Sequence, residues 1–208
     1  EVIGYGFALT PDGTMLAMSG YAKTVEVRKW NPEMQRWDLR GDKLYESSGT
    51  NADDGFGNAV ALSDDGTVLA VGCRNAKWGD YAYGDVHVFD LNGNTWDRRN
   101  PACTALRGTQ QNKYAGERIA MSGNGNILAL STNYATNDAG AAGAGEARVF
   151  ERNGDCWVQQ SAQPYDDIGG EAEWDMLQNV ALSKDGTILA VGAHGNDGAN
   201  GAMSSAGH

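Results

Sequence analysis

A short phrase occurs four times along the chain at nearly regular intervals. Its copies read ALTPDGTMLAMSG, ALSDDGTVLAVG, AMSGNGNILALS and ALSKDGTILAVG, and they begin at Ala8, Ala61, Ala120 and Ala181. The turn glycines of the four copies are 53, 59 and 61 residues apart: Gly13, Gly66, Gly125 and Gly186. A period of this length indicates a repeat architecture, in which each unit covers its apolar faces by packing on its neighbours.

A second phrase follows each of the first three copies and keeps step with the first phrase. It reads VEVRKWNPEMQRW, VHVFDLNGNTW and ARVFERNGDCW, and its closing residues, 59 and 61 positions apart, are Trp37, Trp96 and Trp157. Two phrases that advance together are improbable by chance, so we divide the chain into repeats at about 1–53, 54–112 and 113–173, with an incomplete repeat at 174–208.

Each repeat predicts four short strands. In the second repeat an apolar stretch at 59–62 meets a turn at 63–66, and the chain returns as Val68 to Val71. Asp or Asn before Gly is expected to supply the positive φ of a tight hairpin. Four consecutive apolar residues predict a second strand that is buried on both faces.

The third and fourth strands differ from the second in their polarity. Val86 and Val88 flank His87, and the same alternation around Glu26 in the first repeat predicts a third strand that is half exposed, with His87 facing the surface. A turn at 92–94 leads to a fourth strand that begins at Trp96 and becomes polar at once, as an edge strand does.

The expected fold is therefore all-β: an incomplete β-propeller of four-stranded antiparallel blades, with about three and a half blades in this chain. A β-sandwich would show alternation of apolar and polar residues in every strand. Helical repeats are excluded by the glycine-rich turns. Because propellers close with 4–8 blades, further blades from the same chain or from another copy are expected to complete the ring.

The phrases ALSDDGTVLAVG, GDVHVFDLNGNTW and GTNADDGFGNAVALS resemble the FG-GAP-like repeats of integrin-alpha-type propellers, and the strand–DG–strand portion is similar to WD-type repeats. The resemblance implies a non-catalytic module that binds a protein or glycan, or acts as a scaffold, outside the cell or at its surface. We do not expect the calcium sites of this family here, because the connection at 63–67 is too short to place six or more oxygen ligands around a calcium ion. No metal and no cofactor is expected.

The order of the strands places the long connections together on one face of the propeller, which we name the long-loop face. Rigidly held loops of this kind are common binding surfaces. The face holds six candidate binding aromatics: Trp78, Tyr81, Tyr83, Tyr114, Tyr134 and Trp174. The alternative is that these rings pack back over the loops as covers. The loops also contain acidic residues that predict either an acidic face for a basic partner or a merely solvated one: Asp53, Asp54, Asp166, Asp167, Glu171 and Glu173.

The formal net charge of −11 argues against nucleic acid as a partner, because a polyanion needs a basic surface. No apolar run approaches the ~20 residues that cross a bilayer, so direct membrane insertion is not expected. Catalytic motifs of the G-x-S-x-G or H-E-x-x-H kind are absent from the sequence, and we predict a protein without enzymatic activity. The alternatives are a structural subunit of a large assembly and a hydrolase or lyase whose catalytic residues lie outside this sequence.

Three cysteines, Cys73, Cys103 and Cys156, leave the redox state open. Either Cys73 and Cys103 form one bridge, or all three are buried thiols. No C-x-x-C spacing is present, which makes a zinc site improbable.

Overall fold

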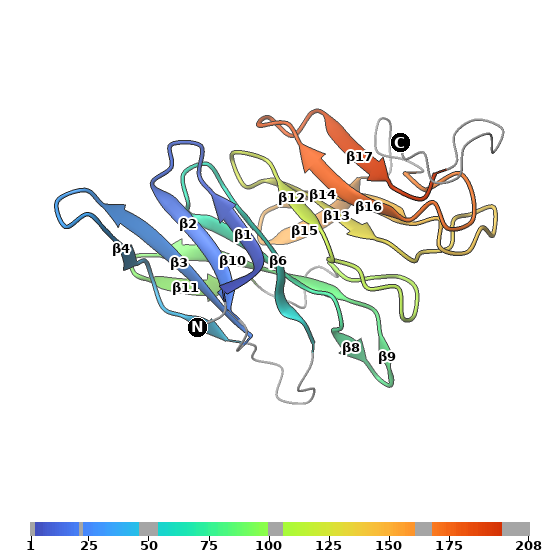
Figure 1. Cartoon of the computed structure of the whole chain (residues 1–208), viewed down its shortest axis with the longest axis horizontal. Coiled ribbons are helices and arrows are strands. Elements are labelled where there is room, and N and C mark those ends of the chain that lie inside the picture. Colours follow the sequence, from blue (N-terminus) through green and yellow to red (C-terminus); the bar gives the residue numbers. More distant parts are fainter. Residues whose placement is uncertain (1–2, 21–22, 46–53, 100–105, 161–167, 197–208) are drawn as a thin grey trace.

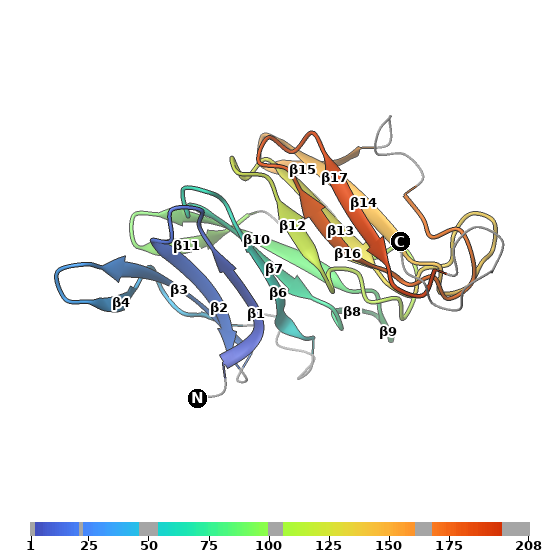
Figure 2. The same cartoon turned by 45° about the horizontal axis from the view of Figure 1, so that its top comes forward.

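A computed structural model of the chain describes residues 3–20, 23–45, 54–99, 106–160 and 168–196. Within these ranges the chain folds entirely into strands and loops, with no helix. Figures 1 and 2 show the sheets side by side in chain order, from the blue N-terminal sheet to the red C-terminal pair.

Three four-stranded antiparallel sheets and one two-stranded sheet form the blades. Blade 1 is β1 (Ile3–Leu9), β2 (Met15–Gly20), β3 (Thr24–Asn31) and β4 (Arg36–Leu39). Blade 2 is β6 (Phe56–Leu62), β7 (Val68–Cys73), β10 (Asp85–Asn92) and β11 (Thr95–Arg98). Blade 3 is β12 (Ile119–Met121), β13 (Ile127–Thr132), β14 (Glu146–Asn153) and β15 (Cys156–Gln160), and blade 4 is β16 (Leu177–Leu182) and β17 (Leu189–Ala193). The predicted incomplete propeller is confirmed.

Two short pairings add to the blades. β5 (Leu44–Tyr45) pairs with β3, and β8 (Lys77–Trp78) pairs with β9 (Tyr81–Ala82) as a small hairpin. This hairpin lies in the connection between the second and third strands of blade 2, where the sequence predicts only a long loop.

The first turn of each blade is held by the same set of hydrogen bonds. In blade 2 the Ser63 hydroxyl accepts a bond from the Val68 N–H (2.9 Å) and donates one to Asp65 Oδ1 (2.7 Å). Gly66 carries the positive φ of 69°, whereas Asp65 does not adopt a positive φ. The expectation that Asp or Asn supplies the positive φ is therefore wrong: glycine supplies it, and the carboxylate or amide caps the turn.

These first turns also connect successive blades, and we name them together the hub (residues 63–68, 122–127 and 183–188). The Asp64 N–H donates to the Gly123 carbonyl (2.8 Å), and the Gly123 N–H donates to the Lys184 carbonyl (2.7 Å). Lys184 Nζ lies 2.7 Å from Asp64 Oδ2. In blade 1 the corresponding residue is Pro11, which has no N–H to donate. The hub hydrogen bonds thus set the spacing of blades 2, 3 and 4.

Burial along the second strands depends on the number of neighbouring blades. Every residue of β7 is buried, and in β13 every residue except Ile127 is buried. β2 alternates between buried and half-buried, and most of β17 is half-buried or exposed. Blades 2 and 3 have a blade on each side, whereas blades 1 and 4 have one neighbour each among the described residues.

This dependence of burial on the number of neighbouring blades also corrects the prediction for the third strand. β3 alternates as predicted, but β10 is buried from Val86 to Phe89. His87 is 7% exposed, not surface-facing; its ring centroid lies 6.1 Å from that of Phe56, and its Nε2 lies 3.6 Å from Asp85 Oδ2. Blades 1 and 3 cover both faces of β10, which the sequence of one strand cannot report.

The closing tryptophans join each blade to the one before it. Trp96 Nε1 donates to the Arg40 carbonyl at the end of blade 1 (2.9 Å), and its ring fills the space beside Gly41. The Arg99 guanidinium, at the end of blade 2, lies 5.5 Å from the centroid of Trp157. Trp37 closes blade 1 and packs edge-on against Trp30 within its own hairpin.

The cysteines differ from both alternatives that the sequence leaves open. Cys73 is buried at the end of β7, opposite Phe56, and takes no part in a disulfide. Cys156 is disulfide-bonded. Cys103 lies outside the described residues. A bridge between Cys73 and Cys103 is therefore wrong, because the Cys73 thiol is enclosed in the core between neighbouring strands.

Replacing Trp96 by Ala should lower the free energy of unfolding by about 3–5 kcal/mol, the usual cost of removing a buried tryptophan. Trp37→Ala is the matched control, because it removes the same side chain from a half-buried hairpin and should cost about 1 kcal/mol. Urea unfolding followed by circular dichroism measures both, and equal losses would contradict the role of Trp96 between blades.

The turn carboxylates should make the fold sensitive to acid. Hydrogen bonds from Ser183 and Thr187 lower the pKa of Asp185 to about 2. Hydrogen bonds from the hydroxyl of Thr10 and from Thr14 also lower the pKa of Asp12. Because these folded-state pKa values lie below the unfolded values, the stabilisation is present above about pH 4 and is lost as the pH falls toward 2.

A triple variant tests this acid sensitivity: Asp12→Asn, Asp65→Asn and Asp185→Asn. It copies the natural turn of blade 3, where Asn124 accepts the same bonds. The urea midpoint of the variant should change less between pH 5 and pH 2 than that of the wild type. Asp80→Asn, at an exposed turn, is the control that should leave the acid response unchanged.

Candidate functional site

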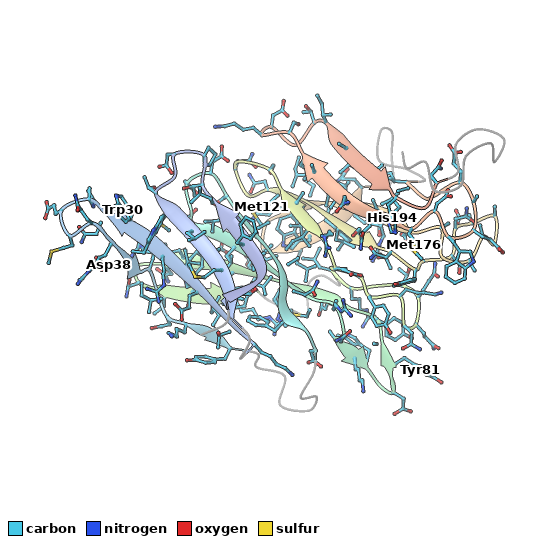
Figure 3. All side chains as sticks on the ribbon, viewed as in Figure 1. Trp30, Asp38, Tyr81, Met121, Met176 and His194 are labelled. Atoms are coloured by element: carbon cyan, nitrogen blue, oxygen red, sulfur yellow. The ribbon has the colours of Figure 1, made fainter. Side chains whose placement is uncertain are left out.

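The long connections gather at one end of the blades, as their strand order requires. Figure 3 labels Tyr81 in the β8–β9 hairpin, and Met176 and His194 beside the ends of β16 and β17, on the same side of the molecule. Trp30 and Asp38 lie in the β3–β4 hairpin at the far side. The long-loop face predicted from the sequence is therefore present.

The structure separates the six predicted aromatics into two pockets and one outlier. Tyr114, Tyr134 and Trp174 line a pocket of about 450 Å³, which we name the aromatic pocket. Trp78 and Tyr83 line a second pocket of about 540 Å³, which we name the cationic pocket after its two arginines. Tyr81 lies outside both pockets, opposite Trp78 across the β8–β9 hairpin.

The rings of the aromatic pocket come from three different connections. Tyr114 precedes the first strand of blade 3, Tyr134 follows its second strand, and Trp174 precedes the first strand of blade 4. Tyr114 and Tyr134 pack edge-on, with their centroids 6.1 Å apart. The Trp174 ring lies so close to Gly143 that a Cβ there would meet the ring at 2.7 Å. Trp174 is 57% exposed and Tyr134 is 37% exposed, so a ligand can reach both rings.

Two of these aromatics adopt a backbone conformation that disfavours large side chains. φ is 61° at Tyr114 and 66° at Trp174. Tyr114 occupies the position of Gly55 in blade 2 (φ 70°) and Met176 in blade 4 (φ 52°), whereas Trp174 occupies the position of Asn112 in blade 3 (φ 56°). Left-handed non-glycine residues cost about 1–3 kcal/mol each and gather at functional sites. Glycine would avoid this cost, yet the chain places an aromatic ring at each of these two left-handed positions.

Neighbouring hydrogen bonds hold the strained backbone in place. The Trp174 N–H donates to the Ala142 carbonyl (3.1 Å), and the Met176 N–H donates to the Gly143 carbonyl (3.1 Å). The Ala115 N–H, next to Tyr114, donates to the Tyr83 carbonyl (3.0 Å). The backbone that carries the rings is therefore fixed before any ligand arrives.

Polar groups at the rim of the aromatic pocket come mainly from Arg74, Asn112, Lys113 and Glu117. Arg74 lies 5.8 Å from the Tyr114 centroid, and its Nη1 lies 3.5 Å from Glu117 Oε1. Glu117 Oε2 also accepts a bond from Asn133 Nδ2 (2.7 Å). Aromatic faces beside fixed donors and acceptors are suited to a ligand with apolar faces and polar edges.

The cationic pocket lies between blades 2 and 3. It is lined by side chains and backbone of Trp78, Tyr83, Arg107, Gly108, Thr109, Arg148 and Gln159. The Arg107 guanidinium lies 4.3 Å from the Trp78 centroid, a cation–π distance. Arg148, which lies in β14, is 5% exposed and donates from Nη2 to the Arg107 carbonyl (2.6 Å).

The charges of the pockets differ from the acidic face that the sequence suggests. Arg74, Lys113, Arg107 and Arg148 line the two pockets, and Glu117 is their one acidic lining residue among the described residues. Asp54 is 4% exposed, whereas Glu171 and Glu173 are exposed outside both pockets. Asp53, Asp166 and Asp167 lie outside the described residues. The pocket linings are therefore cationic: Arg74, Arg107 and Lys113 come from the long connections themselves, and Arg148 comes from β14.

The described part of the chain contains no group of three or more His, Cys, Asp or Glu side chains placed to hold a metal ion. No helix long and apolar enough to span a bilayer occurs among the described residues. Asn137 closes a turn by accepting from the Ala141 N–H (2.9 Å) and donating to the Gly170 carbonyl (2.8 Å), which is ordinary turn chemistry.

Comparisons with solved structures agree with the propeller fold. The chain is similar to TolB from Acinetobacter baumannii, with 13% identity and a TM-score of 0.52, over 96% of this chain and 39% of that one. It is also similar to a candidate 6-phosphogluconolactonase from Bacteroides uniformis, with 13% identity and a TM-score of 0.54, over 89% and 46% of the two chains. A third similar structure, described as a candidate TolB from Agrobacterium tumefaciens, has 11% identity, a TM-score of 0.51 and coverage of 93% and 54%.

These structures are β-propellers, and at such low identity the likeness concerns the fold alone. The chain spans about two fifths to just over half of their lengths. No protein-family model matches the sequence, and no curated protein matches it.

Proposed function

We propose that the chain is a non-catalytic binding module whose long-loop face binds a glycan in the aromatic pocket. The proposal rests on one observation above the others: Tyr114 and Trp174 both occupy left-handed backbone positions, and both rings line the same pocket. Backbone strain that local hydrogen bonds maintain under two rings of one pocket suggests that the rings serve a ligand more than the fold.

The chemistry of the aromatic pocket favours a sugar as this ligand. A pyranose ring has an apolar face that stacks on tryptophan or tyrosine, and its hydroxyls need donors and acceptors at the edge. The rim provides both kinds of group through Asn112, Lys113 and Glu117. A protein ligand is the second candidate, favoured by the exposed rings of Trp78 and Tyr81 in the β8–β9 hairpin.

Trp174→Gly and Tyr114→Gly separate binding from folding. Each variant removes a ring and relieves a strained backbone, so the free energy of unfolding should stay unchanged or rise by about 1 kcal/mol. Binding to a glycan array should fall about tenfold or more, as expected when a stacking aromatic anchor is lost. Trp30→Gly, in the hairpin at the far side, is the control.

Unchanged glycan binding in both pocket variants would contradict the proposed site. If neither the wild type nor any variant binds an array of neutral and charged glycans, glycan recognition itself is wrong. A protein retained by the wild type and lost by a Trp78→Ala and Tyr81→Ala double variant would then support the second candidate.

We further propose that the module works outside the cell or at its surface. The disulfide of Cys156 supports this location, because stable disulfides form mainly in oxidising compartments. A relationship to FG-GAP-like propellers, to which the repeat phrases are similar, would agree with the same location.

We infer that further blades, from the same chain or another copy, cover the two ends of this arc. Phe7 and Leu9 on blade 1 are 77% and 56% exposed, and Ile188 and Val191 on blade 4 are 68% and 41% exposed. Apolar side chains at the equivalent positions of blade 2 are covered by a neighbouring blade, as Val68 is. Uncovered sheets of this kind tend to associate.

Sedimentation of the 208-residue chain tests this inference. The chain should form dimers or larger species, and the double variant Phe7→Ser with Ile188→Ser should shift them toward the monomer. A monodisperse, well-folded wild-type monomer would contradict the need for further blades. Met34→Ser, which changes an exposed apolar residue in the β3–β4 turn, is the control.

A further inference from the structure

We propose that the cationic pocket binds the carboxylate of a uronic acid, so that the module recognises an acidic glycan. The inference rests on the proposed glycan-binding function and adds the substrate class to it. It depends on three features of the pocket: a buried arginine with an unsatisfied donor, a second arginine placed over an aromatic ring, and ring faces beside polar side chains.

Arg148 is the buried arginine. Its side chain is 5% exposed, and its Nε lies 3.2 Å from Glu146 Oε1 in an orientation that makes no hydrogen bond. Burial lowers the pKa of the Arg148 guanidinium, and the charge of Glu146 acts in the opposite direction. A buried cation with an unsatisfied donor is unfavourable, and an anion at the mouth of the pocket would offset this cost.

Arg107 is the second arginine, and it is accessible. Among the described residues, no carboxylate lies within ion-pair distance of its guanidinium. Arg148 Nη2 holds the Arg107 carbonyl, and the Trp78 ring supports the Arg107 guanidinium at 4.3 Å. A guanidinium over a ring can still donate from the N–H groups at the edge of its plane to both oxygens of one carboxylate.

The charges around the pocket favour a single anionic group. Two arginines, Arg107 and Arg148, line the pocket, and Glu146 is the one carboxylate that forms an ion pair with them among the described residues. Two positive charges and one negative charge leave about one net positive charge at the site. The chain as a whole carries −11, but screening confines that repulsion to about 8 Å at physiological ionic strength. The short-range bonds within the pocket therefore decide binding.

The remaining lining favours a sugar as the carrier of the carboxylate. Trp78 is 55% exposed and Tyr83 is half-buried, so both present ring surface to the pocket. Thr109 and Gln159 are exposed and place a hydroxyl and an amide beside the arginines, where they can bond the hydroxyls of a pyranose. The volume of about 540 Å³ lies in the usual range for small-molecule sites.

Matched probes test the assignment: trigalacturonic acid and its fully methyl-esterified form, which differ in charge but not in the sugar rings. By isothermal titration calorimetry the wild type should bind the acid about tenfold or more tightly than the ester, because charge-assisted bonds to arginine are lost in the ester. Arg107→Gln should bind both forms equally weakly, and Arg107→Lys should keep part of the preference.

Arg98→Gln is the control, because it removes the same charge from an exposed position of β11 outside both pockets. Equal wild-type binding of the acid and the ester would overturn the proposal, as would an equal loss in Arg98→Gln and Arg107→Gln. Hexaglutamate that binds as tightly as the uronide, with the same dependence on Arg107, would overturn the choice of a sugar.

Trp174→Gly separates this proposal from the proposed aromatic site. If Trp174→Gly weakens the acid and the ester alike while Arg107→Gln removes only the preference for the acid, both sites are supported. If Trp174→Gly changes neither and Arg107→Gln still removes the preference, the aromatic pocket fails and the uronate pocket stands.

Discussion

The structure depends on the packing of each blade between two others. A four-stranded sheet of this size cannot cover both of its own faces, and the second strand of blade 2 shows the result of stacking: all of β7 is buried. The Trp96 ring and the hub bond from Asp64 to Gly123 hold neighbouring blades at the distance that this packing requires. Where a neighbour is missing, as beside blade 4, apolar side chains such as Ile188 stay in solvent.

Radial packing also explains where recognition can develop. The residues of the strands and first turns make the contacts of the core and the hub, so few substitutions are compatible with these positions. The long connections make few of these contacts, and they differ from one blade to the next. One backbone position illustrates this: it is Gly55 in blade 2, Tyr114 in blade 3 and Met176 in blade 4, always with a positive φ. A shared conformation thus presents no side chain in blade 2, an aromatic ring in blade 3 and a thioether in blade 4.

Much of the architecture could be read from the sequence because it is local and repeated. The turn phrase encodes a hairpin through Ser63, Asp65 and Gly66, whose bonds join residues within five positions. Tyr114, Tyr134 and Trp174 could be found because aromatic rings in polar loops are conspicuous. Arg148 could not, because it lies within β14 and its position below Arg107 follows from the contact between two blades. The prediction that His87 faces the surface is wrong for the same reason, because its burial follows from contacts between blades.

The repeat, the four-stranded blade, the first turns and the division into a short-turn face and a long-loop face can be read from the amino-acid sequence, since each follows from hydrogen bonds and polarity close along the chain. The identity of the buried faces, the grouping of the aromatics into pockets and the arginine lining in a chain of net charge −11 follow from the folded structure instead. Burial and electrostatics depend on distances in space, and stacking blades brings together residues such as Arg107 and Arg148, which are far apart along the chain.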